Sequence, residues 1–172
     1  MKKFALLPYL VPRARRSKSW LFVLNTILAR TVPFNRPHGF RIHSIAQNTI
    51  EAFAPYRRSN HNHIRGVHAC AIATVAEFSA GFLLLTRLDP TRYRLIMGKL
   101  EADYFYQAKK DIIAQADLAD HDLQEKIVTP LTHQDSATIV MTTSIRDVAG
   151  NSVARVETTW QVKNWETVRT KV

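Results

Sequence analysis

A single carboxylate, Glu77, lies in the middle of the most apolar segment of the chain. If this segment is a helix, no cation lies one turn away, because the residues there are Ala73, Thr74, Ala80 and Gly81. A buried and unpaired carboxylate is costly, so Glu77 must accept hydrogen bonds, become neutral or face a cleft. It could also point to solvent at a sheet edge, or pair with an arginine from elsewhere in the chain. Spacing alone leaves these alternatives open.

The residues ahead of this carboxylate could supply the rest of a site. Asn62 lies 15 positions before it and His68 lies nine before it, with Gly66 between them. A helix that begins near His68 has unpaired backbone N–H groups in its first turn, at the positive end of the helix dipole. Such a helix end can stabilise a developing oxyanion when it faces a cleft. Ala69 and Cys70 are small enough to let a carbonyl group approach the backbone there.

The expected helix also separates these two groups. Glu77 is about 12 Å along the helix from its start, at roughly 1.5 Å per residue. That distance is too long for the carboxylate and the N–H groups to act on one atom within a single chain. In a dimer, the helix of a second chain could bring its carboxylate close.

The run from Asn62 to Glu77 (Asn-His-Ile-Arg-Gly-Val-His-Ala-Cys-Ala-Ile-Ala-Thr-Val-Ala-Glu) resembles the signature of hotdog acyl-CoA thioesterases of the phenylacetate-degradation type. In that signature an asparagine precedes Gly-x-His-Gly-Gly, and an acidic residue follows within the helix. The segment from Gly98 to Ala108 resembles the third strand of that family. Over residues 40–163, the chain is similar to bacterial hotdog proteins grouped as a domain of unknown function.

The resemblance implies a role for each matching residue. Glu77 would activate water or attack the thioester carbonyl directly. The Ala69 amide would bind the thioester oxygen, Asn62 would position water or substrate, and His68 would shape the loop. The segment that binds the substrate oxygen would comprise Gly66, Ala69 and Cys70. The substrate would be an acyl-CoA or acyl-carrier thioester, with CoA as part of the substrate and no separate cofactor.

In that family the asparagine and the acid face each other across a dimer interface, so the resemblance implies a homodimer or tetramer. Two positions depart from the family pattern. Ala69-Cys70 replaces the Gly-Gly pair, which could restrict the backbone of the oxyanion loop. Some relatives carry Ser or Thr on the third strand, where this chain has Met97. The alternative function is therefore a noncatalytic hotdog module that binds acyl-CoA or an acyl chain.

Other side chains in this region suggest different chemistry. Cys70 at a helix start could be a thiolate nucleophile, although a small buried core cysteine is commoner. No carboxylate or cysteine stands at a usual metal-partnering spacing from the nearby histidines, which are His61, His63 and His68, so no metal site is predicted. Arg57 and Arg58 could bind a CoA phosphate by bidentate contacts, or form a solvated surface pair.

The elements that would position these groups follow from the hydrophobic pattern. Val67–Leu85 is apolar all round, which is typical of a core helix, and a membrane span is disfavoured by the ionisable residue at its middle. The polar stretch Tyr56–Arg65 before it predicts a loop. The expected strands are Phe40–Ile45, Thr49–Pro55, Arg94–Tyr104, Asp111–Leu118, Ser136–Asp147 and Ser152–Lys163. Asp147–Asn151 would be a hairpin turn, and Asp120–Lys126 a short helix or an irregular link.

One long helix against a six-stranded antiparallel sheet is an α+β arrangement, and the resemblance makes it a hotdog fold. Residues 40–172 would form the hotdog domain, and residues 1–39 a basic helical extension. Within this extension we expect an irregular arm over residues 1–18 and a helix over Ser19–Arg30 with Ser19 as its N-cap. A turn would follow at Pro33–Gly39.

The net charge of +10 is concentrated in this extension. The first 50 residues carry nine Lys or Arg and no acid, whereas the other 122 residues carry 15 bases and 14 acids. Such a region could approach anionic lipid, cofactor phosphates or nucleic acid. No RNP, helix-turn-helix or zinc-finger pattern accompanies the charge, which disfavours nucleic acid.

The remaining signals concern location. The single cysteine excludes an internal disulfide and is compatible with a reducing compartment. Pro8 and Pro12 interrupt the apolar stretch behind Lys2 and Lys3, so no cleaved signal peptide is predicted. We expect a cytoplasmic protein that could contact a membrane peripherally through its basic N-terminus.

Overall fold

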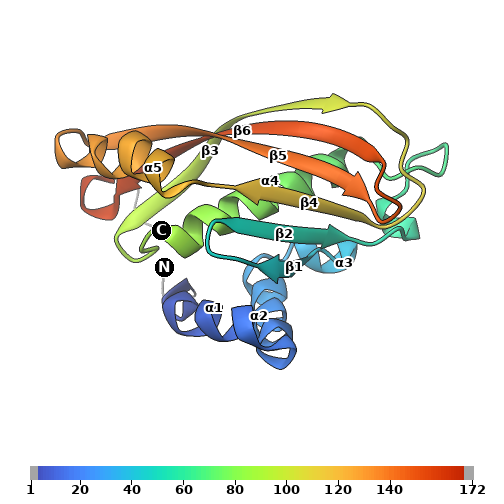
Figure 1. The fold of residues 1–172 in the computed structure, drawn as a ribbon, viewed down its shortest axis with the longest axis horizontal. Coiled ribbons are helices and arrows are strands. Elements are labelled where there is room, and N and C mark those ends of the chain that lie inside the picture. The colour runs from blue at the N-terminus through green and yellow to red at the C-terminus, as the bar shows by residue number, and fades with distance from the viewer. Residues whose placement is uncertain (1–3, 169–172) are drawn as a thin grey trace.

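In the computed structural model, which describes residues 4–168, an antiparallel sheet curves around one long helix (Figure 1). The strands are β1 (Arg41–Ile45), β2 (Thr49–Ala54), β3 (Tyr93–Tyr104), β4 (Ile112–Asp117), β5 (Ser136–Asp147) and β6 (Ser152–Asn164). Their order in the sheet is β1-β2-β4-β5-β6-β3, and every neighbouring pair is antiparallel. The helix inside the curve is α4 (Ala69–Arg87). The predicted α+β arrangement is confirmed.

The core explains why α4 is apolar on every side. Eleven of its residues are buried, and the sheet lies over it (Figure 1). Facing it, β5 buries every second residue along most of its length, as the two-residue period of a strand requires. In the described part of the chain, α4 is the one helix long and apolar enough to cross a membrane, and 61% of its apolar window is covered by protein. The apolar residues of α4 therefore form part of the protein core.

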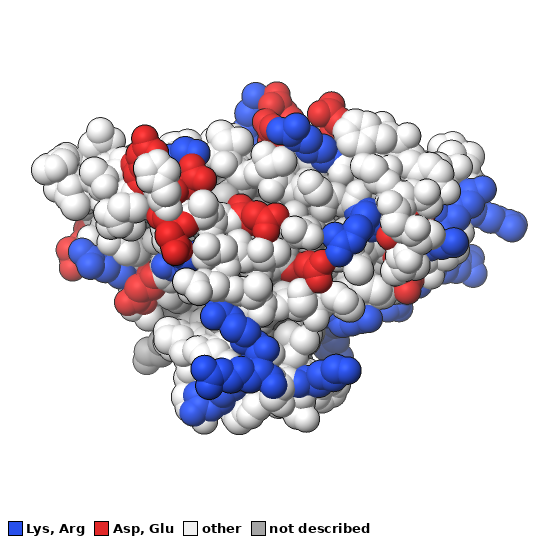
Figure 2. Space-filling view, viewed as in Figure 1, with Lys and Arg blue, Asp and Glu red and all other residues white. Residues whose placement is uncertain are grey.

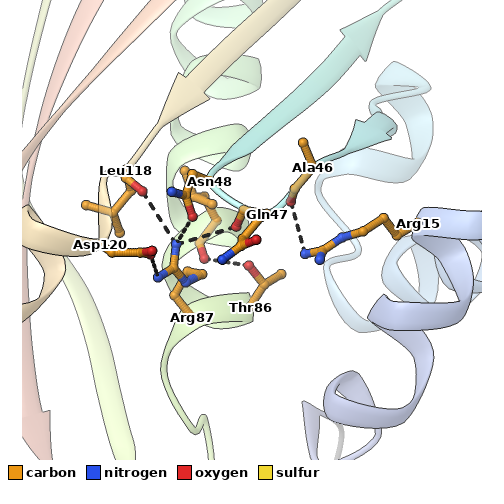
Figure 3. Close-up of polar contacts among 9 residues, drawn as sticks. Arg15, Ala46, Gln47, Asn48, Thr86, Arg87, Leu118 and Asp120 are labelled. Carbon is orange, nitrogen blue, oxygen red and sulfur yellow. Dashed lines mark hydrogen bonds and ion pairs between the residues drawn. The ribbon is translucent and has the colours of Figure 1, made fainter.

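The C-terminal end of α4 is tied to the sheet by Arg87 (Figure 3). Its guanidinium donates to the Gln47 carbonyl and the Asn48 side chain in the β1–β2 turn, and to the Leu118 carbonyl after β4. It also forms an ion pair with Asp120 at the start of α5 (Asp120–Leu123). These contacts fix the helix end relative to two connections of the sheet.

The N-terminal region contradicts one prediction. An irregular arm over residues 1–18 is wrong, because helix α1 (Leu7–Arg16) occupies most of that stretch. Pro8 lies in the first turn, where its missing N–H removes no helical hydrogen bond. Pro12 does interrupt the helix interior, but the face that packs on the core outweighs this cost. The buried residues of that face are Leu7, Leu10, Val11 and Ala14.

The second helix is also shifted from its expected bounds. Helix α2 (Lys18–Thr31) begins one residue before the predicted Ser19. Ser17 occupies the N-cap position in place of Ser19, and it makes no side-chain cap hydrogen bond. A side-chain cap hydrogen bond therefore does not begin α2. Packing of the apolar side of the helix, which buries Leu24 and Leu28, stabilises it instead.

The two helices cover the β1 edge of the sheet (Figure 1). Asn25 of α2 takes the place of a neighbouring strand: its Nδ2 donates to the Ile42 carbonyl at 2.9 Å, and the Ile42 N–H donates to its Oδ1 at 2.7 Å. Arg15 of α1 donates to the Ala46 carbonyl in the β1–β2 turn (Figure 3). At the opposite edge, β3 pairs only with β6 among the described residues.

The other predicted elements are confirmed, with ends that shift by one or two residues. The turn at residues 33–39 contains a short helix, α3 (Asn35–His38), which ends at Gly39 in the left-handed region (φ 69°). The helix start expected at Val67 falls two residues later, because His68 is the N-cap of α4. The remaining short turns are 3₁₀ at Arg58–Asn60, Pro130–Thr132 and Trp165–Thr167, and π-helical at Gln124–Val128 after α5.

Candidate active site

A tight polar loop leads into α4 and is held by Asn62. The Asn62 Oδ1 accepts hydrogen bonds from the backbone N–H groups of Ile64 (3.1 Å) and Gly66 (2.8 Å). Between them, Arg65 adopts a positive φ of 59°, which is uncommon for a residue other than glycine. The side-chain oxygen of Asn62 is therefore committed to the loop. Only its Nδ2 has no partner among residues 4–168.

Gly66 is required because another segment packs across it. A Cβ atom at this position would lie 2.7 Å from Cγ of Gln107, which follows β3. The Gln107 Nε2 also donates to the Ile64 carbonyl at 3.5 Å, and the Val67 N–H donates to the Ala108 carbonyl at 2.9 Å. The segment after β3 thus holds the loop in place, and the absence of a side chain at Gly66 makes room for it.

The first turn of α4 leaves one backbone donor free. Nδ1 of His68 accepts from the Cys70 N–H at 3.0 Å, and the His68 carbonyl accepts from Ala71 and Ile72. The Ala69 N–H has no acceptor among the described residues, and Ala69 is exposed. One N–H at the positive end of the helix is therefore available to an oxygen of a ligand.

Tyr104, at the end of β3, reaches the same helix end. Its hydroxyl donates to the Ala69 carbonyl at 3.2 Å. Burial, together with the nearby Cys70, raises the pKa of the Tyr104 hydroxyl. The sequence did not indicate this contact, because Tyr104 and Ala69 are 35 positions apart and nothing in either residue marks the pairing.

A second residue that the sequence did not point to, Asn60, positions His68. Asn60 is almost fully buried, its Nδ2 donates to the carbonyls of His38 and Pro55, and its Oδ1 bonds to Nδ1 of His38. Its own carbonyl accepts from the His68 N–H at 2.7 Å. Asn60, His38 and His68 border a pocket of about 230 Å³ beside the helix end, which Cys70 also lines. Asn60 and Asn62 lie in one polar stretch, so residue type alone could not separate their roles.

The structure also places Cys70 and the three nearby histidines. Cys70 is exposed, so its expected place in the core is wrong: the helix buries its other sides against the sheet. His61 stacks on Tyr56 with ring centroids 4.1 Å apart, His68 caps α4, and His63 is exposed. Residues 4–168 contain no group of three or more His, Cys, Asp or Glu side chains placed to hold a metal ion.

Glu77 lies two turns further along α4 and lines a different cavity, of about 470 Å³. No described residue makes a hydrogen bond or ion pair with its carboxylate, and burial raises the pKa of Glu77. Of the alternatives left open by spacing, Glu77 thus faces a cleft. The walls come from α4, α2, β3 and β6, and include Leu28, Val32, Phe78, Phe82, Ile96 and Trp160.

Arg94 of β3 lines the same cavity as Glu77. Its Nε is buried and has no hydrogen-bond partner among residues 4–168. The acid and the arginine that line this largely apolar cavity therefore form no ion pair with a described residue, and each could bind a polar group of a ligand. Arg94 was not among the residues that the sequence indicated, since it stands 17 positions from Glu77 with no shared motif.

Within one chain, the residues predicted to form one site fall into two groups. Asn62, Gly66, His68, Ala69 and Cys70 lie together at the N-terminal end of α4. Glu77 lies apart, about 12 Å along the helix axis at roughly 1.5 Å per residue. His68 and Cys70 line a different pocket from Glu77, and none of the first group lines the Glu77 cavity, so a single chain does not bring the two groups to one atom.

Comparison with known proteins places the whole arrangement in a family. The family described as Domain of unknown function (DUF4442) matches residues 20–162. The chain belongs to this family. No curated protein matches the sequence.

Solved structures resemble this DUF4442 chain over most of its length. A Pseudomonas aeruginosa protein of unknown function, described as a probable thioesterase, is 23% identical with a TM-score of 0.75, over 83% of this chain and 94% of that one. A thioesterase from Haemophilus influenzae is 15% identical with a TM-score of 0.68, over 87% and 94%. A protein of unknown function from Chlorobaculum tepidum is 14% identical with a TM-score of 0.73, over 88% and 98%. These similarities establish the hotdog fold.

The DUF4442 chain accommodates Ala69-Cys70 without backbone strain. Both residues lie in the first turn of α4, and Arg65 is the one described residue other than glycine with a positive φ. The restriction expected from losing the Gly-Gly pair is therefore not found, because helical backbone needs no glycine.

Arg58 begins the 3₁₀ turn Arg58–Asn60, Arg57 is the N-cap of that turn, and both arginines are exposed. Neither forms an ion pair with a described residue. Basic side chains gather at this end of the molecule (Figure 2). Binding of a CoA phosphate by these two arginines stays a prediction.

Proposed function

We propose that this DUF4442 protein hydrolyses an acyl thioester, carried by CoA or by an acyl-carrier protein. The observation that carries the proposal is Glu77, an unpaired carboxylate with a raised pKa on the wall of a largely apolar cavity. A volume of about 470 Å³ is within the range of small-molecule sites, and its apolar lining suits an acyl chain. A carboxylate whose pKa moves toward neutrality is a better general base.

In this proposal, Glu77 and the free Ala69 N–H have complementary tasks. The Glu77 carboxylate takes a proton from water while the water oxygen bonds to the thioester carbon. The carbonyl oxygen becomes an oxyanion, and the Ala69 N–H donates to it. Collapse breaks the carbon–sulfur bond, and Glu77 returns the proton to the departing thiolate, giving a carboxylic acid and a thiol. Direct attack by Glu77 would pass through an anhydride that water then opens, with the same products.

The distance between the two groups leads us to propose a homodimer in which each site combines Glu77 of one chain with Ala69 of the other. The unpaired β3 edge supports this assembly, because twelve residues of exposed strand edge invite pairing with another strand. Ile96 and Met97 on that strand are large, exposed and apolar, as an interface requires. Pairing of two β3 strands would bring two α4 helices side by side under one continuous sheet.

A noncatalytic acyl-binding module is the second candidate, and one observation favours it. The oxygen of Asn62 is already bonded within the loop, and the Cys70 N–H is bonded to His68. Of the predicted site residues in the described chain, Ala69 offers its N–H and Asn62 its Nδ2 to hold an oxyanion, which is a sparse set for catalysis.

The test is release of free thiol from a panel of acyl-CoA substrates of different chain length. We expect turnover for some member of the panel, and a loss of about 10²- to 10⁴-fold in Glu77→Gln, the usual contribution of a general base. Glu125→Gln is the matched control, because Glu125 is an exposed glutamate that lines neither pocket. Thermal stabilisation by acyl-CoA with no turnover on any substrate would favour the binding module. Full activity in Glu77→Gln would reject Glu77 as the base.

A further inference from the structure

The outer side of the hairpin formed by α1 and α2 exposes several large apolar side chains. Phe22 is 73% exposed, and Leu6, Tyr9 and Val23 are 56%, 51% and 39% exposed. The inner side of the same helices is buried, with Leu24 and Leu28 of α2 in the core. An outward apolar row on an otherwise amphipathic hairpin is costly in water, and it needs a partner to cover it.

The charged residues around this apolar row are all basic. Exposed Arg15, Arg16, Lys18 and Arg30 lie on the hairpin, and the first 50 residues contain no acid to neutralise them. Figure 2 shows basic and no acidic side chains over the part of the surface that α1 and α2 form. The exposed apolar side chains are therefore surrounded by positive charge.

The aromatic and basic groups are also in contact with one another. The Arg13 guanidinium lies 3.5 Å from the centroid of the Tyr9 ring and 5.7 Å from that of Trp20. Tyr9 and Trp20 meet edge to face with centroids 5.9 Å apart. Tyr and Trp rings beside an arginine are the combination that favours the headgroup level of a bilayer, where one side is apolar and the other is charged.

We propose that the outer surface of the α1–α2 hairpin docks on an anionic lipid bilayer. Phe22, Val23 and Leu6 would enter the acyl boundary, and the surrounding bases would lie against lipid phosphates. Each base near an anionic membrane surface contributes about 1 kcal/mol, so several bases together with a few apolar side chains suffice for reversible binding.

A bilayer fits this surface better than the alternatives. Nucleic acid would satisfy the bases but leave Phe22 and Val23 facing a polar phosphate backbone. A second copy of the chain in a two-fold interface would bring the same bases against each other, and like charges there repel. Only a partner that is anionic at its surface and apolar beneath it matches both kinds of side chain.

Docking of the hairpin would place the Glu77 cavity near the membrane, because the hairpin forms part of the cavity wall. Leu28 of α2 and Val32, its C-cap, line that cavity on the inner side of the helix whose outer side carries Phe22. Asn25 and Arg15 fasten the hairpin to the β1 strand and the β1–β2 turn, so it is presented as a fixed surface. A lipid-bound chain would then hold its acyl-sized cavity close to the membrane.

The test is co-sedimentation of the full-length protein with phosphatidylcholine vesicles, with and without phosphatidylserine. Removing α1 would delete its buried residues, among them Leu7 and Leu10, and uncover the core that they pack against, so point variants are used. Arg16→Glu with Lys18→Glu reverses two bases that make no described hydrogen bond or ion pair, and Phe22→Ser removes the most exposed apolar side chain. Lys109→Glu with Lys110→Glu, two exposed bases outside the hairpin that also make no described hydrogen bond or ion pair, is the matched control. Thermal unfolding verifies that every variant is folded.

We expect binding to phosphatidylserine vesicles that weakens tenfold or more in the Arg16→Glu, Lys18→Glu variant and weakens with salt. Phe22→Ser should bind less at low and at high salt, while the control binds as wild type. No binding to phosphatidylserine vesicles, or equal loss in the control, overturns the proposal. So does a hairpin variant that retains vesicle binding but loses binding to a single-stranded or duplex oligonucleotide, which would assign the surface to nucleic acid. The assay contains no thioester, so its result is independent of the proposed hydrolysis.

Discussion

The N-terminal end of α4 and its middle differ in whether their polar groups have hydrogen-bond partners. At the N-terminal end, polar groups satisfy one another: Asn62 closes the loop, His68 caps the helix, and Asn60 holds His68. In the middle, Glu77 has no partner among the described residues and faces apolar walls. One half of the candidate site is therefore prearranged by hydrogen bonds. The other half holds the Glu77 carboxylate buried without a partner, which lowers the stability of the fold when the carboxylate is charged.

This difference teaches what each half contributes to the proposed reaction. A hydrogen-bonded frame with one free N–H suits the binding of charge that develops on an oxygen, because the donor needs no rearrangement. An unpaired carboxylate in an apolar setting suits proton transfer, because nothing competes for its oxygens. The two halves are useful together only if a second chain brings them within reach.

At the N-terminal end of α4, the largest effect is expected from a substitution that removes the free donor and nothing else. Ala69 is the first residue of α4, where proline is well tolerated, and the extended His68 before it (φ −66°, ψ 139°) is compatible with a following proline. Ala69→Pro should lower kcat by about 10²- to 10³-fold, as for loss of one oxyanion donor. Ala69→Ser keeps the N–H and should retain activity. Thiol release by folded Ala69→Pro at the wild-type rate would exclude this amide as the donor.

Mixing two inactive variants tests whether the halves belong to different chains. Random pairing of Ala69→Pro and Glu77→Gln chains gives heterodimers in which one site keeps both groups, so activity should return to about a quarter of the wild-type value. Co-expression with two affinity tags isolates the heterodimer for assay. Activity that stays at the level of the parent variants would mean that both groups act within one chain or not at all.

The sequence predicted the fold more completely than the site. Alternation in the strands and the all-round apolarity of α4 come from burial, which the hydrophobic pattern encodes directly. The prediction from sequence was wrong at α1, where Pro8 and Pro12 suggested an irregular arm. The segment is helical because its apolar face is buried against the core. The contacts of Asn60, Arg94 and Tyr104 were not predicted, because they join distant segments of the chain and no local sequence pattern records such contacts.

A smaller effect tests the frame at the N-terminal end. Gly66→Ala would place a methyl group 2.7 Å from Gln107, so it should destabilise the protein by about 1–3 kcal/mol through overpacking. Adding Gln107→Ala should recover most of that loss, because the contact then disappears. Urea denaturation measures both. Gly98→Ala is the control, since a Cβ there meets its nearest neighbour at 3.9 Å. Failure of Gln107→Ala to recover stability would assign the cost to another contact.

The smallest expected effect tests the middle of α4, and its sign depends on pH. Burial raises the pKa of Glu77 above the unfolded value of about 4.3, so the folded chain holds this proton more tightly. Between the unfolded and the folded pKa, stability contributed by this group falls as pH rises. Above the folded pKa the full penalty of the buried charge is present, and below the unfolded pKa it is absent. Glu77→Gln should therefore raise the unfolding temperature near pH 8 and change it little near pH 4.

The comparison between the two pH values separates this effect from ordinary packing changes, which would shift the unfolding temperature equally at both. Glu125→Gln serves as the control, because an exposed carboxylate stays in water in both states. If Glu77→Gln raised the unfolding temperature equally at pH 4 and pH 8, burial of the charged carboxylate would not be what lowers stability. An unpaired acid would then no longer distinguish the middle of α4 from its N-terminal end. If instead the gain appears only at the higher pH, the same carboxylate that lowers stability is the one available to take a proton from water.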